Sequence, residues 1–96
     1  MKGHINGTPV HNMLVDSGAI VNLMSYLFYQ TLGWLRWELI KTKMTISGIG
    51  GGPPLHAMGN TSMELTIGSK TLAIAFFVAD VQGYNLILGH DWSQAN

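Results

Sequence analysis

The chain has 96 residues, of which 47% are hydrophobic and 10% are charged, and its five basic and five acidic residues cancel at neutral pH. A chain of this length predicts one domain over residues 1–96, and domains of this size are often stabilised by oligomerisation. The zero net charge removes the attraction that drives binding to nucleic acid or anionic membranes, so we expect neither partner. Without cysteine, disulfides and thiolate metal sites are excluded.

The composition also bears on location and on metals. No stretch approaches the roughly 20 apolar residues of a membrane span, and the start of the chain lacks the apolar core of a secretory signal. Since the absence of cysteine suits a reducing compartment, we expect an intracellular, cytoplasmic location. The histidines lack the short spacing of metal ligands, so we expect no metal site. These histidines are His4, His11, His56 and His90.

The first third of the chain predicts strands and one helix. The Asn6-Gly7 pair is a strong hairpin signal between strands expected over residues 3–6 and 9–15. Residues 20–24 are apolar enough for a buried strand. Ser25 then precedes a short helix over residues 26–32, and Gly33 follows it as the terminating glycine.

The middle of the chain contains a glycine-rich segment. Residues 34–43 show no clear period, so we interpret them as a connection with a strand toward Ile46. Residues 47–54 (SGIGGGPP) interrupt regular structure, because glycine permits positive φ and proline removes a hydrogen-bond donor. We expect a mobile loop or hairpin tip there.

The last third predicts more strands. Residues 55–67 and 71–78 read as two strands of a meander joined by a Gly68-Ser69 turn. Residues 84–88 form a brief apolar strand, and those after Gly89 could open a short helix. Because strand-like segments outnumber the one clear helix, the predicted class is all-β with one or two short helices.

Asp16 is the residue that most needs an explanation. The apolar run over residues 13–15 leads into it, where a carboxylate is costly to desolvate unless hydrogen bonds stabilise it. Ser17 and Gly18 then supply a hydroxyl donor and a flexible backbone. This is the local chemistry of an aspartic protease active-site loop. The alternative is a turn aspartate that caps nearby N–H groups, as in most Asp-Ser-Gly sequences.

Aspartic protease chemistry needs two carboxylates that share one proton. One acts as a base toward water while the other polarises the scissile carbonyl. None of the remaining acids lies in a second apolar-Asp-Ser/Thr-Gly motif, so a catalytic site requires a symmetric homodimer with two copies of Asp16 across a two-fold axis. The remaining acids are Glu38, Glu64, Asp80 and Asp91.

Three stretches resemble, in this order, the retropepsin family, the dimeric aspartic proteases of retroviruses and long-terminal-repeat retrotransposons. They are residues 14–19 (LVDSGA), 47–52 (SGIGGG) and 86–89 (LILG). The surrounding residues look most like the protease segment of plant Ty3/gypsy-type polyproteins. The resemblance implies a retropepsin-like closed β-barrel that is half of a two-fold symmetric dimer. It also implies an endopeptidase that processes a polyprotein without a cofactor.

The resemblance implies roles for single residues. Asp16 would be the catalytic aspartate, the Ser17 hydroxyl would link the two active-site loops, and Gly18 would let the substrate backbone approach. Residues 47–54 would be the flap, which closes over a bound peptide and excludes water. Residues 86–89 would pack beneath the active-site loop. The expected substrate-binding residues are Ala19, Ser47, Gly48, Ile49, Gly50 and Gly51.

Two features depart from the family's pattern. The family usually has Arg after the late glycine, often paired with an acid just past the active-site loop, and these positions are His90 and Ile20 here. Seven residues follow Gly89, too few for the terminal strands that usually tie the dimer, so we expect a weak dimer or a truncated chain. An alternative is therefore a catalytically inactive binding or dimerisation module. A third reading is the retropepsin-like domain of a cellular ubiquitin-linked shuttle protein.

Overall fold

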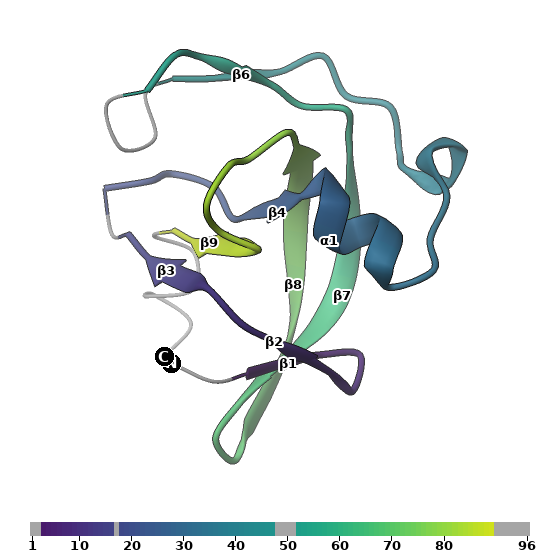
Figure 1. Cartoon of the computed structure of the whole chain (residues 1–96), viewed down its shortest axis with the longest axis vertical. Helices are drawn as coiled ribbons and strands as arrows, with labels where there is room; N and C mark the ends of the chain where they lie inside the picture. Colours follow the sequence, from purple (N-terminus) through teal and green to yellow (C-terminus); the bar gives the residue numbers. More distant parts are fainter. Residues whose placement is uncertain (1–2, 17, 48–51, 90–96) are drawn as a thin grey trace.

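The computed structural model describes residues 3–16, 18–47 and 52–89. Within these residues the chain forms a seven-stranded sheet in the order β2-β1-β7-β8-β4-β9-β3, a two-stranded sheet of β5 and β6, one α-helix and one 3-10 helix (Figure 1). The sheet curls into a nearly closed barrel, so the all-β prediction is confirmed. No helix in the described part of the chain is long and apolar enough to cross a membrane.

The elements are short except for the β7–β8 hairpin, which is the longest pairing in the sheet. In chain order they are β1 Gly3–Ile5, β2 Thr8–Val10, β3 Met13–Val15, β4 Leu23–Ser25, α1 Tyr26–Thr31, the 3-10 helix η1 Arg36–Glu38, β5 Thr45–Ile46, β6 Leu55–His56, β7 Gly59–Ile67, β8 Lys70–Ala79 and β9 Leu86–Leu88.

The hairpin predicted at Asn6-Gly7 is confirmed. β1 and β2 are antiparallel, and the turn residues have φ values of 48° and 84°, as a type I′ turn requires. The single strand predicted over residues 9–15 is wrong, because Asn12 has a φ of 57° and turns the chain between β2 and β3. Asparagine enters this left-handed region more easily than most residues. β3 therefore leaves the hairpin and pairs elsewhere.

Two parallel pairings form the part of the sheet nearest Asp16. β3 pairs with β9, with Val15 opposite Leu88. β4 pairs in parallel with β8 and antiparallel with β9, so β9 lies between β3 and β4 (Figure 1). The expected meander is limited to the antiparallel β7–β8 hairpin. Strands from opposite ends of the chain are thus neighbours in the sheet.

The predicted helix is confirmed with small changes of boundary. Ser25 ends β4 and caps α1, because its hydroxyl accepts a hydrogen bond from the Phe28 N–H at 3.0 Å. Gly33 follows the helix with a φ of 90°. The strand expected toward Ile46 is confirmed as β5. The strand expected over residues 55–67 divides into β6 and β7, and the helix expected after Gly89 falls outside the described residues.

The core lies on both faces of β9. Leu86 and Leu88 belong to the larger buried cluster, which also contains Phe76 and Tyr29, whereas Ile87 belongs to a smaller cluster with Leu23 and Ile46. A strand with both faces covered reads as a continuous apolar run, which explains the sequence of β9. Its position in the middle of the fold makes it a fixed support for the loop above it.

Candidate active site

Asp16 lies directly after β3, where the chain leaves the sheet. Its backbone N–H donates to the Leu88 carbonyl at 2.8 Å, so β9 fixes the position of the residue. Its carbonyl accepts a hydrogen bond from the Ala19 N–H at 3.0 Å, which turns the chain back toward Asp16. The sheet and this turn together hold the Asp16 backbone from both sides.

The Asp16 carboxylate is half-buried and points back over its own turn. Its Oδ1 accepts a hydrogen bond from the Gly18 N–H at 3.0 Å. A Cβ atom at Gly18 would lie 3.2 Å from the same oxygen, so glycine leaves room for the carboxylate. This hydrogen bond fits a capping aspartate and a catalytic one equally well, and the surroundings of the side chain are what separate the two.

A cavity of about 300 Å³ opens beside Asp16. The loop after Asp16 forms one wall, and residues 44–47 form the other. Asp16 is the one charged side chain among the described lining residues, and Ile20 is 76% exposed. This carboxylate can accept hydrogen bonds from a group bound in the cavity. The described lining residues are Asp16, Gly18, Ala19, Ile20, Val21, Met44, Thr45, Ile46 and Ser47.

The cavity brings together four of the predicted site residues, namely Asp16, Gly18, Ala19 and Ser47. They come from two segments that are distant in the sequence, as the predicted active-site loop and flap require. The specific roles of these residues remain predictions. The other predicted site residues lie outside the described residues, as does His90; they are Ser17, Gly48, Ile49, Gly50 and Gly51.

Asn22 is a residue of this region that the sequence reasoning missed. It is 2% exposed, and its Oδ1 accepts a hydrogen bond from the Gly89 N–H at 2.8 Å while its Nδ2 donates to the Ala75 carbonyl at 3.4 Å. The side chain therefore joins the ends of the active-site loop, β9 and β8. A signal was available, since a polar residue inside the apolar run 20–24 must find buried partners.

Gly89 packs directly beneath the active-site loop. A Cβ atom there would clash with the Val21 carbonyl oxygen and lie 2.7 Å from the Ala19 carbonyl oxygen. No side chain fits without moving the backbone that leads away from Asp16. The predicted packing of residues 86–89 beneath this loop is confirmed.

The described residues contain no group of three or more His, Asp or Glu side chains that could hold a metal ion. Among its described lining residues, the cavity offers the Asp16 carboxylate and the backbone groups around it. General acid–base catalysis on a bound peptide is within the reach of such groups once a second carboxylate is present.

The barrel with its parallel β3–β9 pairing, the Asp16 carboxylate bound by the Gly18 N–H and the glycine packed beneath this loop define a retropepsin-like protease domain. The sequence matches the PEG10/RTL1 protease domain family over residues 12–95, and the chain belongs to that family. No curated protein sequence matches the chain.

Solved structures of retropepsin-like proteins share this fold. The EIAV protease complexed with the inhibitor HBY-793 is 27% identical, with a TM-score of 0.70 over 99% of this chain and 84% of that one. The retroviral protease-like domain of Ddi1 from Leishmania major is 24% identical, with a TM-score of 0.72 over 98% and 73%. A retropepsin-like aspartic protease from Rickettsia conorii is 20% identical, with a TM-score of 0.71 over 98% and 68%. The predicted fold class is confirmed.

Proposed function

We propose that the chain is an aspartic endopeptidase that acts as a homodimer. The observation that carries this proposal is the half-buried Asp16 carboxylate, fixed by Gly18 and facing a cavity with no other charged side chain among its described residues. Aspartic protease chemistry needs two carboxylates that share one proton. A two-fold symmetric pair of chains supplies the second Asp16.

In the paired site, each carboxyl group has a distinct role. The ionised Asp16 takes a proton from water as the water oxygen attacks the scissile carbonyl carbon, and the protonated Asp16 of the second chain donates its proton to the carbonyl oxygen. The resulting tetrahedral diol collapses when a proton passes to the amide nitrogen and the C–N bond breaks. No covalent intermediate forms, and no cofactor is needed.

The residues around Asp16 support this chemistry through position and polarity. The Gly18 N–H orients the carboxylate, and the Leu88 carbonyl holds its backbone. The apolar side chains of Ile20 and Ile46 line the cavity, where they favour apolar substrate side chains and limit water. We expect an extended peptide to lie between the loop and residues 44–47 and to add a strand to existing edges.

We further propose that the natural substrate is the polyprotein of a plant Ty3/gypsy-type retrotransposon and that the enzyme acts in the cytoplasm. The resemblance of residues 15–24 and 77–92 to such polyproteins supports the choice of substrate. Membership of the PEG10/RTL1 protease domain family is compatible with it.

Cleavage and dimerisation measured together test the proposal. We expect a peptide substrate to be cleaved with a bell-shaped pH profile in the acidic range, because the two carboxylates titrate as a coupled pair. Asp16→Asn is expected to lower the rate by about 10²–10⁴-fold. Asp80→Asn is the matched control, since Asp80 is exposed and its carboxylate accepts a hydrogen bond from Gln82.

Analytical ultracentrifugation at pH about 5, with and without a statine-type inhibitor, supplies the second measurement. A dimer stabilised by the inhibitor, with activity lost only in Asp16→Asn, supports the peptidase. Cleavage that survives Asp16→Asn contradicts it. A dimer that cleaves no peptide and ignores the inhibitor favours the alternative of a protease-like binding module.

A further inference from the structure

A second, larger hollow lies on the segment that joins α1 to β5. We call residues 34–44 the arm. An open groove of about 710 Å³ runs along the arm, and none of its described lining residues lines the cavity at Asp16. The groove is lined by Arg36, Trp37, Leu39, Lys41, Thr42, Lys43 and Met58.

The groove is positively charged although the chain as a whole is neutral. Three of the five basic residues of the chain line it, and no described lining residue is acidic. Glu38, the acid within the arm, accepts a hydrogen bond from the Leu35 N–H at 2.8 Å, and its one negative charge, set against the three positive charges of Arg36, Lys41 and Lys43, leaves the arm with an excess of two positive charges. A local positive potential of this kind attracts an anionic partner.

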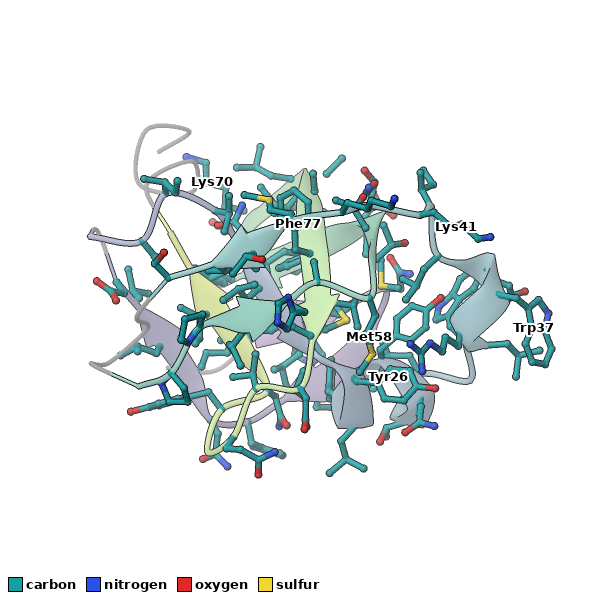
Figure 2. The ribbon with its side chains drawn as sticks, turned by 90° about the horizontal axis from the view of Figure 1, so that it is seen from above. Tyr26, Trp37, Lys41, Met58, Lys70 and Phe77 are labelled. Carbon is teal, nitrogen blue, oxygen red and sulfur yellow. The ribbon has the colours of Figure 1, made fainter. Side chains whose placement is uncertain are left out.

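Trp37 gives the groove a large apolar contact surface. The side chain is 79% exposed, and Figure 2 shows it projecting from the edge of the molecule, on the same side as Lys41. Leu39 is buried and Met58 is half-buried, and both line the groove beside it. Exposed aromatic side chains next to apolar side chains are typical of anchor points at interfaces.

The backbone beside the groove runs between two attached residues, because Ile40 pairs with Asn60 and the Met44 carbonyl accepts a hydrogen bond from the Ala57 N–H at 2.9 Å. Exposure alternates along the arm, with Lys41 and Lys43 exposed and Thr42 and Met44 half-buried. Within the described residues, the backbone of residues 41–43 makes no hydrogen bond. Lys41 and Lys43 are two positions apart, which corresponds to roughly 7 Å where a backbone is extended. Acidic side chains at alternate positions of an extended peptide have the same spacing.

We propose that this groove binds an extended acidic peptide segment. Its acidic side chains at alternate positions pair with Lys41 and Lys43, and an apolar side chain of the peptide packs on Trp37. A peptide backbone can pair with both the N–H and the carbonyl groups of residues 41–43, whereas phosphate oxygens can only accept from the N–H groups, so a peptide fits better than nucleic acid. The proposal does not depend on catalysis at Asp16.

Binding can be measured without cleavage in the Asp16→Asn variant of the 96-residue chain. The ligand is a synthetic peptide that has Glu at alternate positions and one Leu near its centre. The control peptide has Gln in place of every Glu. Titration is followed by NMR of the tryptophan indole N–H signals, with the Trp37 signal assigned by Trp37→Phe. We expect the Trp37 signal to shift with the Glu peptide and the affinity to fall as salt is added.

Substitutions that remove positive charges test where the peptide binds. Lys41→Gln combined with Lys43→Gln is expected to lower the affinity about three- to tenfold. Single substitutions allow a matched comparison, because Lys43→Gln and Lys70→Gln each remove one positive charge, and Lys70 lies at the β7–β8 turn, on the other side of the view in Figure 2. Only Lys43→Gln is expected to weaken binding.

Three outcomes would overturn the proposal. One is an unchanged Trp37 signal at millimolar Glu peptide. The second is equal binding of the Gln peptide, which would show that charge is not recognised. The third is a single-stranded oligonucleotide of the same charge that binds more tightly than the peptide and loses affinity in the Lys41/Lys43 double variant, which would make the groove a phosphate-binding surface.

Discussion

The base of the loop that follows Asp16 is packed against other parts of the backbone at Ala19 and Asn22, whereas the arm lies mostly on the surface. Asn22 and Gly89 are buried and leave no space around them, while Trp34 and Trp37 in the arm are 42% and 79% exposed. Both segments are irregular in structure, yet only one of them is closely packed. An irregular segment is therefore not necessarily mobile or tolerant of substitution. The geometry of the candidate active site depends on close backbone packing, and the arm is free to present side chains to a partner.

The largest expected effect comes from Gly89→Ala. The added methyl group would clash with the carbonyl oxygens of Val21 and Ala19, so we expect the free energy of unfolding to fall by about 3 kcal/mol or more. Gly33→Ala is the control, because Gly33 has a φ of 90° but no atom within 4 Å, and the strained conformation alone costs about 1 kcal/mol. If urea unfolding gives equal losses of unfolding free energy for the two variants, the close packing around Gly89 is not the cause.

The next largest loss of unfolding free energy is expected for Asn22→Ala. It leaves the buried Gly89 N–H without its acceptor, which costs about 1–3 kcal/mol. The same change at Asn60, whose amide contacts the Thr42 side chain of the arm, is expected to cost less, because Asn60 is only half-buried. Urea unfolding of both variants measures the difference. A larger loss at Asn60 would reverse the comparison between the two regions.

Tyr29 provides a prediction on pH. Burial, followed by the charges of Glu38 and Tyr26, raises the pKa of Tyr29 above its usual 10.0. The unfolded chain therefore releases this proton first, so the contribution to stability is complete below pH about 10 and is lost as the pH rises toward the folded-state pKa.

Tyr29→Phe removes the hydrogen bond that the hydroxyl donates to the Leu35 carbonyl at 3.0 Å. We expect a loss of about 1 kcal/mol at pH 7 and a shallower decline in stability above pH 10. Unfolding curves recorded between pH 7 and 11 test both parts. An unchanged alkaline decline would show that another group causes it.

The smallest effect is expected for Trp37→Ala. A side chain that is 79% exposed contributes little to the folded state, so the free energy of unfolding should change by less than about 0.5 kcal/mol. Trp34→Ala, at a side chain that is 42% exposed, is expected to cost more. Thermal unfolding of the two variants compares them. A large loss at Trp37 would mean that the arm is packed and its groove is not a free surface.

Local signals in the sequence were sufficient for several elements. The Asn6-Gly7 turn, the Ser25 cap and Gly33 each depend on a few neighbouring residues, and the structure has them where the sequence places them. The resemblance to the retropepsin family, carried by the apolar run before Asp16 and the late glycine of residues 86–89, also predicted that these two segments meet.

Other features depend on contacts between distant residues. Nothing near β3 indicates that it pairs in parallel with β9, and nothing near Asn22 names Gly89 as its partner. The division of residues 9–15 depends on the left-handed backbone of Asn12, which asparagine permits but does not require. The groove on the arm was missed because charge was averaged over the whole chain, where acidic residues elsewhere cancel it.

The pairing of β3 with β9 has a consequence for the order of events during synthesis. The residues that hold Asp16 from below are among the last of the described residues to be made, and contacts between such distant segments form slowly. A nascent chain that stops before β9 contains the Asp-Ser-Gly sequence but not its support. The candidate catalytic residue Asp16 therefore gains its backbone support only after β9 has been made.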